Sequence, residues 1–321
     1  MAQSKKATFK GKAKLFLGVA FLLALGVGYF VFFSVQAAPG SLESEAGTVS
    51  SNAVKKSDVT ASNGQAVAFG SAAPGGFQAN CIATPSACGY PDTTNTGVLP
   101  GVTRTSSGSV TISTNGAVFE NKNVTGQIVV TANNVTIRNV RITSPDYYPI
   151  DYSGTGLLVE NTEIIGTSDA VTACMSFDNY IARRVNCSGG ADGFKANSNV
   201  TIEDSYITGL RIGDETHNDG IQTTGGSNVT IRRNTIDVRG ISAEVMQLGI
   251  EWSANSNWTV DGNLLAGGGW VFNGGPVNPM TITNNRFAGT RAYGIGSVSG
   301  ATYTNNYYDS TGSAVCINNG C

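Results

Sequence analysis

The amino-acid sequence predicts an all-β fold, a right-handed parallel β-helix (a solenoid), preceded by one N-terminal transmembrane helix. Three observations support this prediction. An eight-residue phrase recurs nine times, successive copies start 18 to 29 residues apart, and the chain opens with lysines followed by an uncharged apolar run. A repeat of this length is typical of a solenoid, in which each repeat forms one coil.

The recurring phrase is predicted to form a strand, a corner and a second strand. Its first, third and eighth residues are mostly apolar and its second and fourth mostly polar, which is typical of a half-buried strand. Its fifth and sixth residues favour Asn, Asp or Gly, which tolerate the left-handed backbone of a tight corner. The sequence contains no leucine-rich-repeat pattern, and no ten-residue helical segment fits between the copies. The nine copies are residues 117–124, 135–142, 157–164, 180–187, 200–207, 229–236, 258–265, 280–287 and 301–308.

Two positions of the phrase are expected to form ladders that hold the coils in register. Strands of one sheet lie about 4.8 Å apart, so residues at one position stack directly on each other. The sixth position predicts a buried amide ladder of Asn234, Asn263, Asn285 and Asn306. The fourth position alternates in sign and predicts outward ion pairs, each stabilising by about 0.2–1 kcal/mol. Its residues are Glu120, Arg138, Glu160, Arg183, Glu203, Arg232 and Asp261.

The apolar run Leu15–Val35 is the only helix signal. Its 21 residues suffice to span a bilayer, and the preceding lysines are expected to keep the N-terminus cytoplasmic and the β-helix extracellular. Because the run exceeds the usual apolar core of a signal peptide, we favour an uncleaved single-pass signal anchor. The alternative is a cleaved signal peptide with a site after Ala37, which would make the protein secreted.

The predicted organisation has five parts. Residues 1–14 form a cytoplasmic basic segment, 15–35 the transmembrane signal anchor and 36–75 a flexible spacer. Residues 76–101 form an N-terminal cap and 102–321 the β-helix domain. A cap is expected because the first coil has no neighbour to bury its interior.

Charge and cysteine content limit the function classes. The part beyond the anchor has 15 basic and 22 acidic residues, a formal charge of −7, which argues against nucleic-acid binding. An anionic substrate would therefore need a local cation.

Six cysteines fit an oxidising exterior. We expect the disulfides Cys81–Cys88 and Cys316–Cys321. Cys174 and Cys187 either pair or simply pack in the core, and no cysteine spacing suggests zinc.

A second apolar segment recurs between the phrases and is expected to form the third strand of each coil. Its predicted centres are Cys174, Phe194, Ile221, Ile250, Val271 and Ile295. The residues after these centres predict an outward column of Met175, Lys195, Gln222, Glu251 and Phe272, beside Asp192 and Asp219. Polar groups differ here from coil to coil, which is typical of a site rather than of a register ladder.

The two longest repeats have insertions on this face, at Leu210–His217 and Asp237–Gln247. Insertions in solenoids emerge as loops, often on the binding face. We expect these two to wall a groove, near which Trp252, Trp270, Phe272 and Tyr293 would offer faces for stacking on sugars.

The stretches Cys88–Val98, Asp192–Lys195, Ser205–Ile207, His217–Gln222 and Asn284–Phe287 carry a family resemblance. From Cys88 onward, about 70% of the chain, the sequence resembles secreted bacterial β-helix proteins of the pectate lyase superfamily. The resemblance implies action on polysaccharides, by lyases on uronates, hydrolases or epimerases. The paired-arginine signature of the best-known pectate lyases is missing, and only Asn218–Gly220 is similar to the polygalacturonase set. The fold therefore does not specify the reaction.

Our first hypothesis is a lyase that cleaves an acidic polysaccharide by β-elimination. Lys195 would be the base, His217 or Arg211 would bind or donate to the sugar, and Gln222, Trp252 and Trp270 would bind substrate. Asp192, Asp219 and Glu251 would hold Ca²⁺. The simpler interpretation of the same residues is a structural surface ion pair between Lys195 and an aspartate.

Two further hypotheses remain open. A non-catalytic surface module that binds glycan or another cell ranks second. A glycoside hydrolase ranks third, with Asp219 and Glu251, or Asp192 and Asp219, as its two carboxylates.

Overall fold

The computed structural model describes residues 53–57, 65–69, 77–211, 218–241, 244–248 and 255–317. The chain divides into two compact units, residues 1–50 with 55–68, and residues 51–54 with 69–321. Strands β1 (Ala53–Ser57) and β2 (Gln65–Phe69) form a two-stranded sheet within the predicted spacer. The predicted segments 1–14 and 15–35 lie outside the described residues. Among the residues described, no helix is long and apolar enough to cross a membrane.

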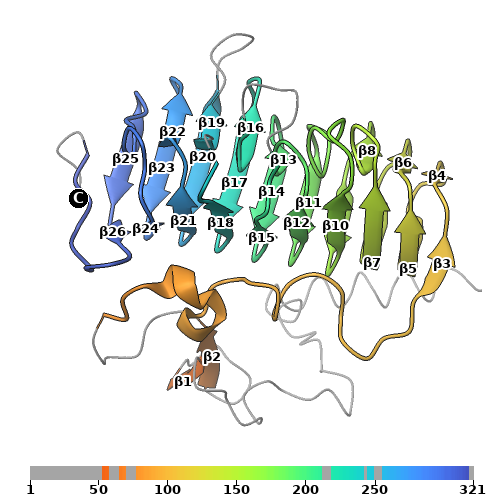
Figure 1. Ribbon diagram of the computed structural model, residues 1–321, viewed down its shortest axis with the longest axis horizontal. Coiled ribbons are helices and arrows are strands. Elements are labelled where there is room, and N and C mark those ends of the chain that lie inside the picture. Colours follow the sequence, from red (N-terminus) through yellow and green to blue (C-terminus); the bar gives the residue numbers. More distant parts are fainter. Residues whose placement is uncertain are drawn as a thin grey trace, which may run out of the picture. The chain divides into compact units, whose positions relative to one another are not determined.

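The second unit contains a parallel β-solenoid, which confirms the predicted all-β fold (Figure 1). One sheet, here called the long sheet, has 17 strands, and the strands formed by successive phrases pair in parallel along it. Its strands are β3 (Thr105–Ser107), β5 (Val118–Thr125), β7 (Thr136–Ser144), β9 (Leu157–Glu160), β10 (Glu163–Gly166), β11 (Tyr180–Arg183), β12 (Asn186–Ser188), β14 (Val200–Glu203), β15 (Tyr206–Ile207), β17 (Ser227–Arg232), β18 (Thr235–Val238), β20 (Ser256–Asp261), β21 (Leu264–Gly267), β23 (Met280–Thr283), β24 (Arg286–Ala288), β25 (Ala301–Thr304) and β26 (Tyr307–Tyr308).

The third strands of the coils form two shorter sheets. A three-stranded sheet contains β4 (Val110–Ile112), β6 (Ile128–Val130) and β8 (Ile150–Tyr152). A four-stranded sheet, here called the short sheet, contains β13 (Phe194–Lys195), β16 (Ile221–Thr223), β19 (Glu244–Leu248) and β22 (Trp270–Gly274). Bridges through Met175 connect the two, from Ile150 on one side to Phe194 on the other.

The predicted corner is confirmed in all nine phrases. The fifth residue of each has a positive φ, between 47° and 66°, a backbone conformation that favours Asn, Asp and Gly. These residues are Asn121, Asn139, Asn161, Arg184, Asp204, Arg233, Gly262, Asn284 and Asn305.

The predicted amide ladder is confirmed, and the charge ladder is confirmed in part, because Glu203 is buried rather than outward. Asn234, Asn263, Asn285 and Asn306 are all 0% exposed. The side-chain oxygens of Asn263 and Asn285 each accept the backbone N–H of the ladder asparagine one coil earlier, at 2.9 Å. In the charge ladder, Arg183 and Arg232 flank Glu203 at 2.6 and 2.5 Å. Burial raises the pKa of Glu203, but hydrogen bonds from the two arginines outweigh it, and the net shift is downward.

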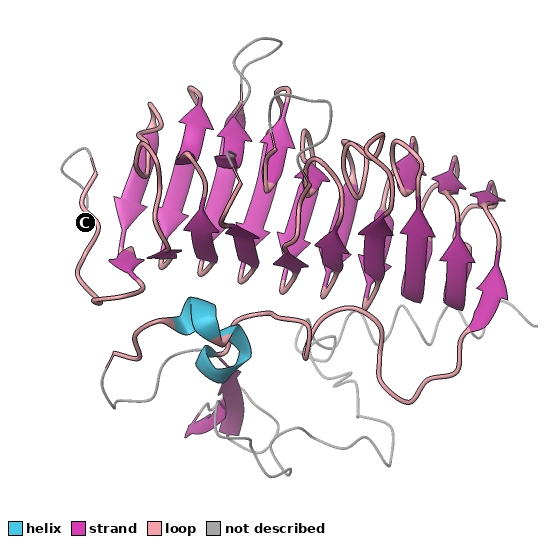
Figure 2. Cartoon of the chain, viewed as in Figure 1, coloured by secondary structure: helices cyan, strands magenta, loops and turns pink. Residues whose placement is uncertain are grey.

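Residues 77–101, here called the strap, do not cover the N-terminal end of the core as we expected of the predicted cap. They run along the corners of the coils, and 3-10 helices η3 (Cys81–Ala83) and η4 (Pro85–Cys88) lie within them (Figure 2). At one end, the Asn80 N–H donates to the Asp309 carbonyl at 2.9 Å. At the other, the Leu99 N–H donates to Asn139 Oδ1 at 2.8 Å. The corners present hydrogen-bonding groups that an extended segment can satisfy.

The disulfide predictions have three outcomes. Cys81 and Cys88 are bonded, as predicted, with an S–S distance of 2.10 Å. Cys174 and Cys187 are also bonded, which resolves the alternative left open by the sequence. Cys316 is disulfide-bonded, and its predicted partner Cys321 lies outside the described residues.

Candidate functional site

The register of the third strands differs from the predicted one at three coils. Met175 and Phe272 point into the core, at 0% and 2% exposure, instead of outward. The strand after β16 is β19, and Met246 pairs with Ile221 where we expected Ile250. The Gly249–Ile250 pair resembled Gly220–Ile221 in sequence. Met246 occupies the inward position instead.

Three carboxylates stand at equivalent positions on successive coils of the short sheet. They are Asp192, Asp219 and Glu244, here called the carboxylate column. Asp192 Oδ1 accepts the backbone N–H of Asp219 at 2.7 Å. Asp219 Oδ1 accepts the backbone N–H of Glu244 at 3.2 Å. The two aspartates were predicted site residues, whereas Glu244 was not. The place predicted for Glu251, next to Gln222 in the outward column, belongs to Gln247.

Glycines next to the aspartates allow the coils to come this close. A Cβ on Gly193 would clash with the Gly220 carbonyl and with Ile207, and one on Gly220 would clash with Ile236. The local sequence Asp-Gly therefore stacks one carboxylate directly on the next coil's backbone.

A network of polar side chains joins the column. Lys195 Nζ donates to Asp192 Oδ2 at 2.5 Å and also to Gln222 Oε1. Gln222 Nε2 donates to Asp219 Oδ2 at 3.0 Å. Asn273 Nδ2 donates to Glu244 Oε1 at 3.2 Å, which extends the network to a fourth coil.

Only the outer edge of this network reaches solvent. Asp192 and Asp219 are 0% exposed and the Lys195 side chain is 7% exposed. Gln222, Glu244 and Asn273 are half-buried. Burial, together with the charge of Asp192 and a hydrogen bond with the Glu244 side chain, raises the pKa of Asp219 to about 9. The surroundings therefore favour the protonated form of the Asp219 carboxyl group.

The role of the carboxylate column in capping backbone N–H groups does not explain why its residues are acids. The amide ladder on the long sheet also caps backbone N–H groups of neighbouring coils, and it does so without charge. Burying ionisable groups costs free energy that amides would not cost. A buried carboxyl group with a raised pKa, such as Asp219, beside other polar groups is typical of catalytic sites.

Glu244 and Asn273 are the residues that the sequence interpretation missed as site members. A signal for them exists, because each coil of the short sheet has the same four-residue pattern. Asp192 precedes Lys195 by three residues, Asp219 precedes Gln222, and Glu244 precedes Gln247.

Other predicted site residues lie apart from the network or outside the described residues. The Arg211 guanidinium binds the backbone carbonyls of Gly189, at 2.8 Å, and Ser168. Its Nη1 also lies 3.6 Å from Asp169 Oδ1, so Arg211 fastens loops rather than joining the column. His217, Glu251 and Trp252 lie outside the described residues.

The predicted calcium ligands do not form a recognisable metal centre in the described part of the chain. There, no group of three or more His, Cys, Asp or Glu residues is arranged to hold a metal ion. Of the predicted ligands, Asp192 gives one oxygen to Lys195 and the other to a backbone N–H. The calcium site stays a prediction.

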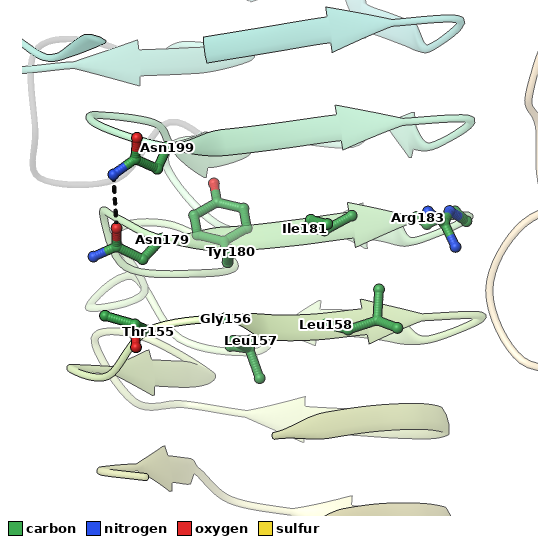
Figure 3. A pocket seen from close by; sticks show the side chains of 9 residues that line it. All are labelled: Thr155, Gly156, Leu157, Leu158, Asn179, Tyr180, Ile181, Arg183 and Asn199. Atoms are coloured by element: carbon green, nitrogen blue, oxygen red, sulfur yellow. Dashed lines mark hydrogen bonds between the residues drawn. The ribbon is translucent and has the colours of Figure 1, made fainter. Parts of the chain in front are cut away.

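A hollow of about 320 Å³ lies elsewhere, on the outer face of the long sheet (Figure 3). Its floor includes Leu158 and Ile181, which pair in register with Thr136 and Thr201 on the flanking coils. The charged group at its edge, Arg183, is already bound to Glu203. The hollow thus lacks the acid–base groups that the carboxylate column offers.

A parallel β-solenoid with a buried acid–base network on its short sheet defines the class of this protein. The family model for the right handed beta helix region matches residues 128–311, and the chain belongs to this family. No curated protein matches the chain, and no solved structure does. Membership of the pectate lyase superfamily stays a prediction.

Proposed function

We propose that this β-helix protein is an extracellular enzyme that hydrolyses the glycosidic bonds of a polysaccharide at the carboxylate column. The observation that carries the proposal is the stacking of three carboxyl groups on successive coils, each of the first two accepting the backbone N–H of the next. Burial also raises the pKa of the middle one, Asp219. Glycoside hydrolysis needs one carboxylic acid that donates a proton and one ionised carboxylate. Such a pair arises where different environments give two neighbouring carboxyl groups different pKa values.

Asp219 and Glu244 suit these two roles. They stand on neighbouring coils, and their side chains share a hydrogen bond. In retaining enzymes two such carboxyl groups lie on either side of the scissile bond, ~5–5.5 Å apart. Binding of the sugar would open the hydrogen bond between Asp219 and Glu244 and expose the buried Asp219 carboxyl. Asp219 would then protonate the glycosidic oxygen while Glu244 attacks the anomeric carbon. Water activated by the Asp219 carboxylate would then release the sugar from Glu244. The half-buried Glu244 and Gln222 form the edge at which the sugar enters.

The charges of the site favour a neutral glycan over a uronate. Of the described cations, Lys195 in the network and Arg211 near it both bind protein groups. Lys195 is paired with Asp192 and Gln222, and Arg211 with backbone carbonyls. A uronate carboxylate would have to compete for them.

A lyase is the second candidate, because Lys195, the base of that hypothesis, belongs to the network. This reaction requires Lys195 to leave Asp192 and act as a neutral amine. Ca²⁺ held by Asp192, Asp219 and Glu251 would then neutralise the substrate carboxylate.

The extracellular location is supported by the two disulfides at Cys81–Cys88 and Cys174–Cys187, because disulfides persist in oxidising compartments. The apolar run Leu15–Val35 would anchor the protein in the cell membrane, or direct its secretion if cleaved after Ala37.

The test is an activity assay of the full chain on neutral polysaccharides and polyuronates, with Ca²⁺ or chelator. We expect new reducing ends on a neutral glycan without ultraviolet-absorbing unsaturated sugars. Asp219→Asn and Glu244→Gln should each lower the rate by about 10²–10⁴-fold. Asp151→Asn is the matched control, because Asp151 is an outward acid on β8, outside the column.

Two outcomes would contradict hydrolysis. A Ca²⁺-dependent rise in ultraviolet absorbance that Lys195→Ala abolishes would establish the lyase. Glycan binding with no turnover of any substrate would instead favour the non-catalytic module.

A further inference from the structure

On the coil after Glu244, an aromatic residue stands at the position that the carboxylate column occupies on the earlier coils. Glu244 of β19 pairs in register with Trp270 of β22, and the two strands are neighbours in the short sheet (Figure 1). Paired residues of a parallel sheet direct their side chains to the same face. Trp270 also precedes Asn273 by three residues, as Asp219 precedes Gln222. The Trp270 ring therefore lies directly beyond Glu244 along the solenoid axis.

A second ring lies beside Trp270. The Tyr293 ring centroid is 5.6 Å from that of Trp270, with 34° between the ring planes. The Tyr293 N–H donates to the Gly269 carbonyl at 2.9 Å, which fixes its loop to the coil of Trp270. A Cβ at Gly294 would lie 3.6 Å from Trp270 Cζ3, so the loop runs close against the indole.

The pair is open to a ligand. Tyr293 is 69% exposed, the highest value among the exposed large apolar and aromatic side chains described, and Trp270 is half-buried. The two tilted rings together offer apolar surface with polar edges. Pyranose rings whose hydroxyl groups are mainly equatorial have apolar C–H faces that fit such a surface. Ligand sites typically combine an aromatic wall with a few convergent polar groups, and here Asn273 and Glu244 stand next to the wall.

We propose that Trp270 and Tyr293 form a stacking subsite for one neutral pyranose ring of a glucose-configured polysaccharide. The inference rests on the proposed cleavage at Asp219 and Glu244 and deepens it. The subsite begins one coil beyond Glu244, about 4.8 Å along the axis. The polysaccharide thus lies lengthwise along the short sheet, with the stacked sugar next to the bond that is cleaved.

Binding of β-linked glucose oligosaccharides tests the subsite separately from catalysis. Titration calorimetry would use the full chain carrying Asp219→Asn, so that no ligand is consumed. We expect Trp270→Ala and Tyr293→Ala each to weaken binding of a hexasaccharide roughly tenfold, the factor that corresponds to about 1.4 kcal/mol of aromatic contact. Tyr307→Ala is the control, since Tyr307 is an exposed tyrosine on β26 of the long sheet.

The outcomes separate the two proposals. The subsite would be overturned if Tyr293→Ala and Trp270→Ala left binding unchanged, or if Tyr307→Ala weakened binding equally. It would also be overturned if the Asp219→Asn chain with intact Trp270 and Tyr293 bound no hexasaccharide. Tyr293 is exposed, so its variant remains informative even where Trp270→Ala fails to fold. Retained hydrolysis by Asp219→Asn, together with lost binding in Tyr293→Ala, would refute the catalytic roles while supporting the subsite.

Discussion

At the scale of single residues, Asp219 shows how the fold creates chemistry from an ordinary side chain. Its carboxyl group is fully buried and lies between Asp192 and Glu244. An asparagine would accept the same backbone N–H of Glu244 without a titratable proton. The carboxyl therefore adds acidity rather than structural stability, and this acidity is measurable in the absence of any substrate.

Asp219 should make stability depend on pH. Its pKa rises from 3.8 to about 9 on folding, so between these values the folded chain holds a proton that the unfolded chain lacks. This contribution is fully present below about pH 4 and is lost as the pH rises towards 9. The free energy of unfolding should fall with pH by at most about 1.4 kcal/mol per pH unit. The variant Asp219→Asn cannot ionise at this position and should lack this pH dependence.

Urea unfolding at pH 5, 7 and 9 measures the difference. Between pH 5 and pH 9, the free energy of unfolding of the native chain should fall by a few kcal/mol more than that of Asp219→Asn, on the order of the linkage slope given above. Parallel stability curves for the two proteins would show that Asp219 is not protonated at neutral pH.

At the scale of the strand and corner, the amide ladder carries more of the stability than its size suggests. Asn263 Oδ1 accepts from both nitrogens of Asn234, and Asn263 Nδ2 donates to Ile231 and Asn285 at 2.9 Å each. All of these groups lie inside the solenoid. Removing one amide leaves several buried donors and acceptors without hydrogen-bond partners.

Asn263→Ala should therefore lower the free energy of unfolding by about 3–5 kcal/mol, since each unsatisfied buried group costs ~1–3 kcal/mol. Thr259→Ala, four residues earlier on the outer face of the same coil, should cost less than ~1 kcal/mol because it loses one 3.5 Å hydroxyl contact. Chemical denaturation of both variants gives the comparison. Equal losses would mean that the ladder is not a special source of stability.

Elements could be predicted from the sequence where local chemistry repeats. The left-handed corner needs particular residues, so Asn139 and Asn284 mark it in any copy. A second corner directly before the phrases, at Asn134, Asn179 and Asn228, had the same signal and was missed. The third strand has no corner of this kind. Its apolar centre alone could not distinguish Met246 from Ile250.

The candidate site was predictable in part for the same reason. Asp192 and Asp219 stand before a glycine that the close coils require, so their placement follows from local sequence. Glu244 precedes Val245, and the long insertion before it hides the register. The pKa of Asp219 follows from no pattern, because it depends on burial and on side chains from other coils. The ion pair between Lys195 and Asp192 agrees with the simpler interpretation of the sequence, except that the pair is buried rather than at the surface.

At the scale of the whole molecule, the strap joins coils that are distant in the chain. No repeat pattern predicts its course, because its partners are corner groups whose positions exist only once the coils have stacked. Its firmest described attachment is at the last coil. Asp309, 1% exposed, accepts the backbone N–H groups of Cys81 and Ile82 at 3.0 and 3.1 Å. Arg286 pairs with the same carboxylate at 3.3 Å.

Asp309→Ala should release this end of the strap and destabilise the last coil. It leaves two backbone N–H groups and the Arg286 guanidinium without their carboxylate, a loss of about 2–4 kcal/mol. Asp237→Ala is the control, because its 2.8 Å pair with the exposed Arg239 is a local surface contact expected to contribute ~0–1 kcal/mol. Thermal unfolding gives the loss, and amide hydrogen exchange gives its location.

Faster exchange in Asp309→Ala should concentrate in residues 77–88 and in the last coil, where β24 and β26 pair. A terminal coil has a neighbour on one side only, so it depends on added contacts more than an internal coil does. Uniformly faster exchange along the whole solenoid would mean that the strap stabilises all coils together. Unchanged exchange would mean that the Cys81–Cys88 loop holds its place without Asp309.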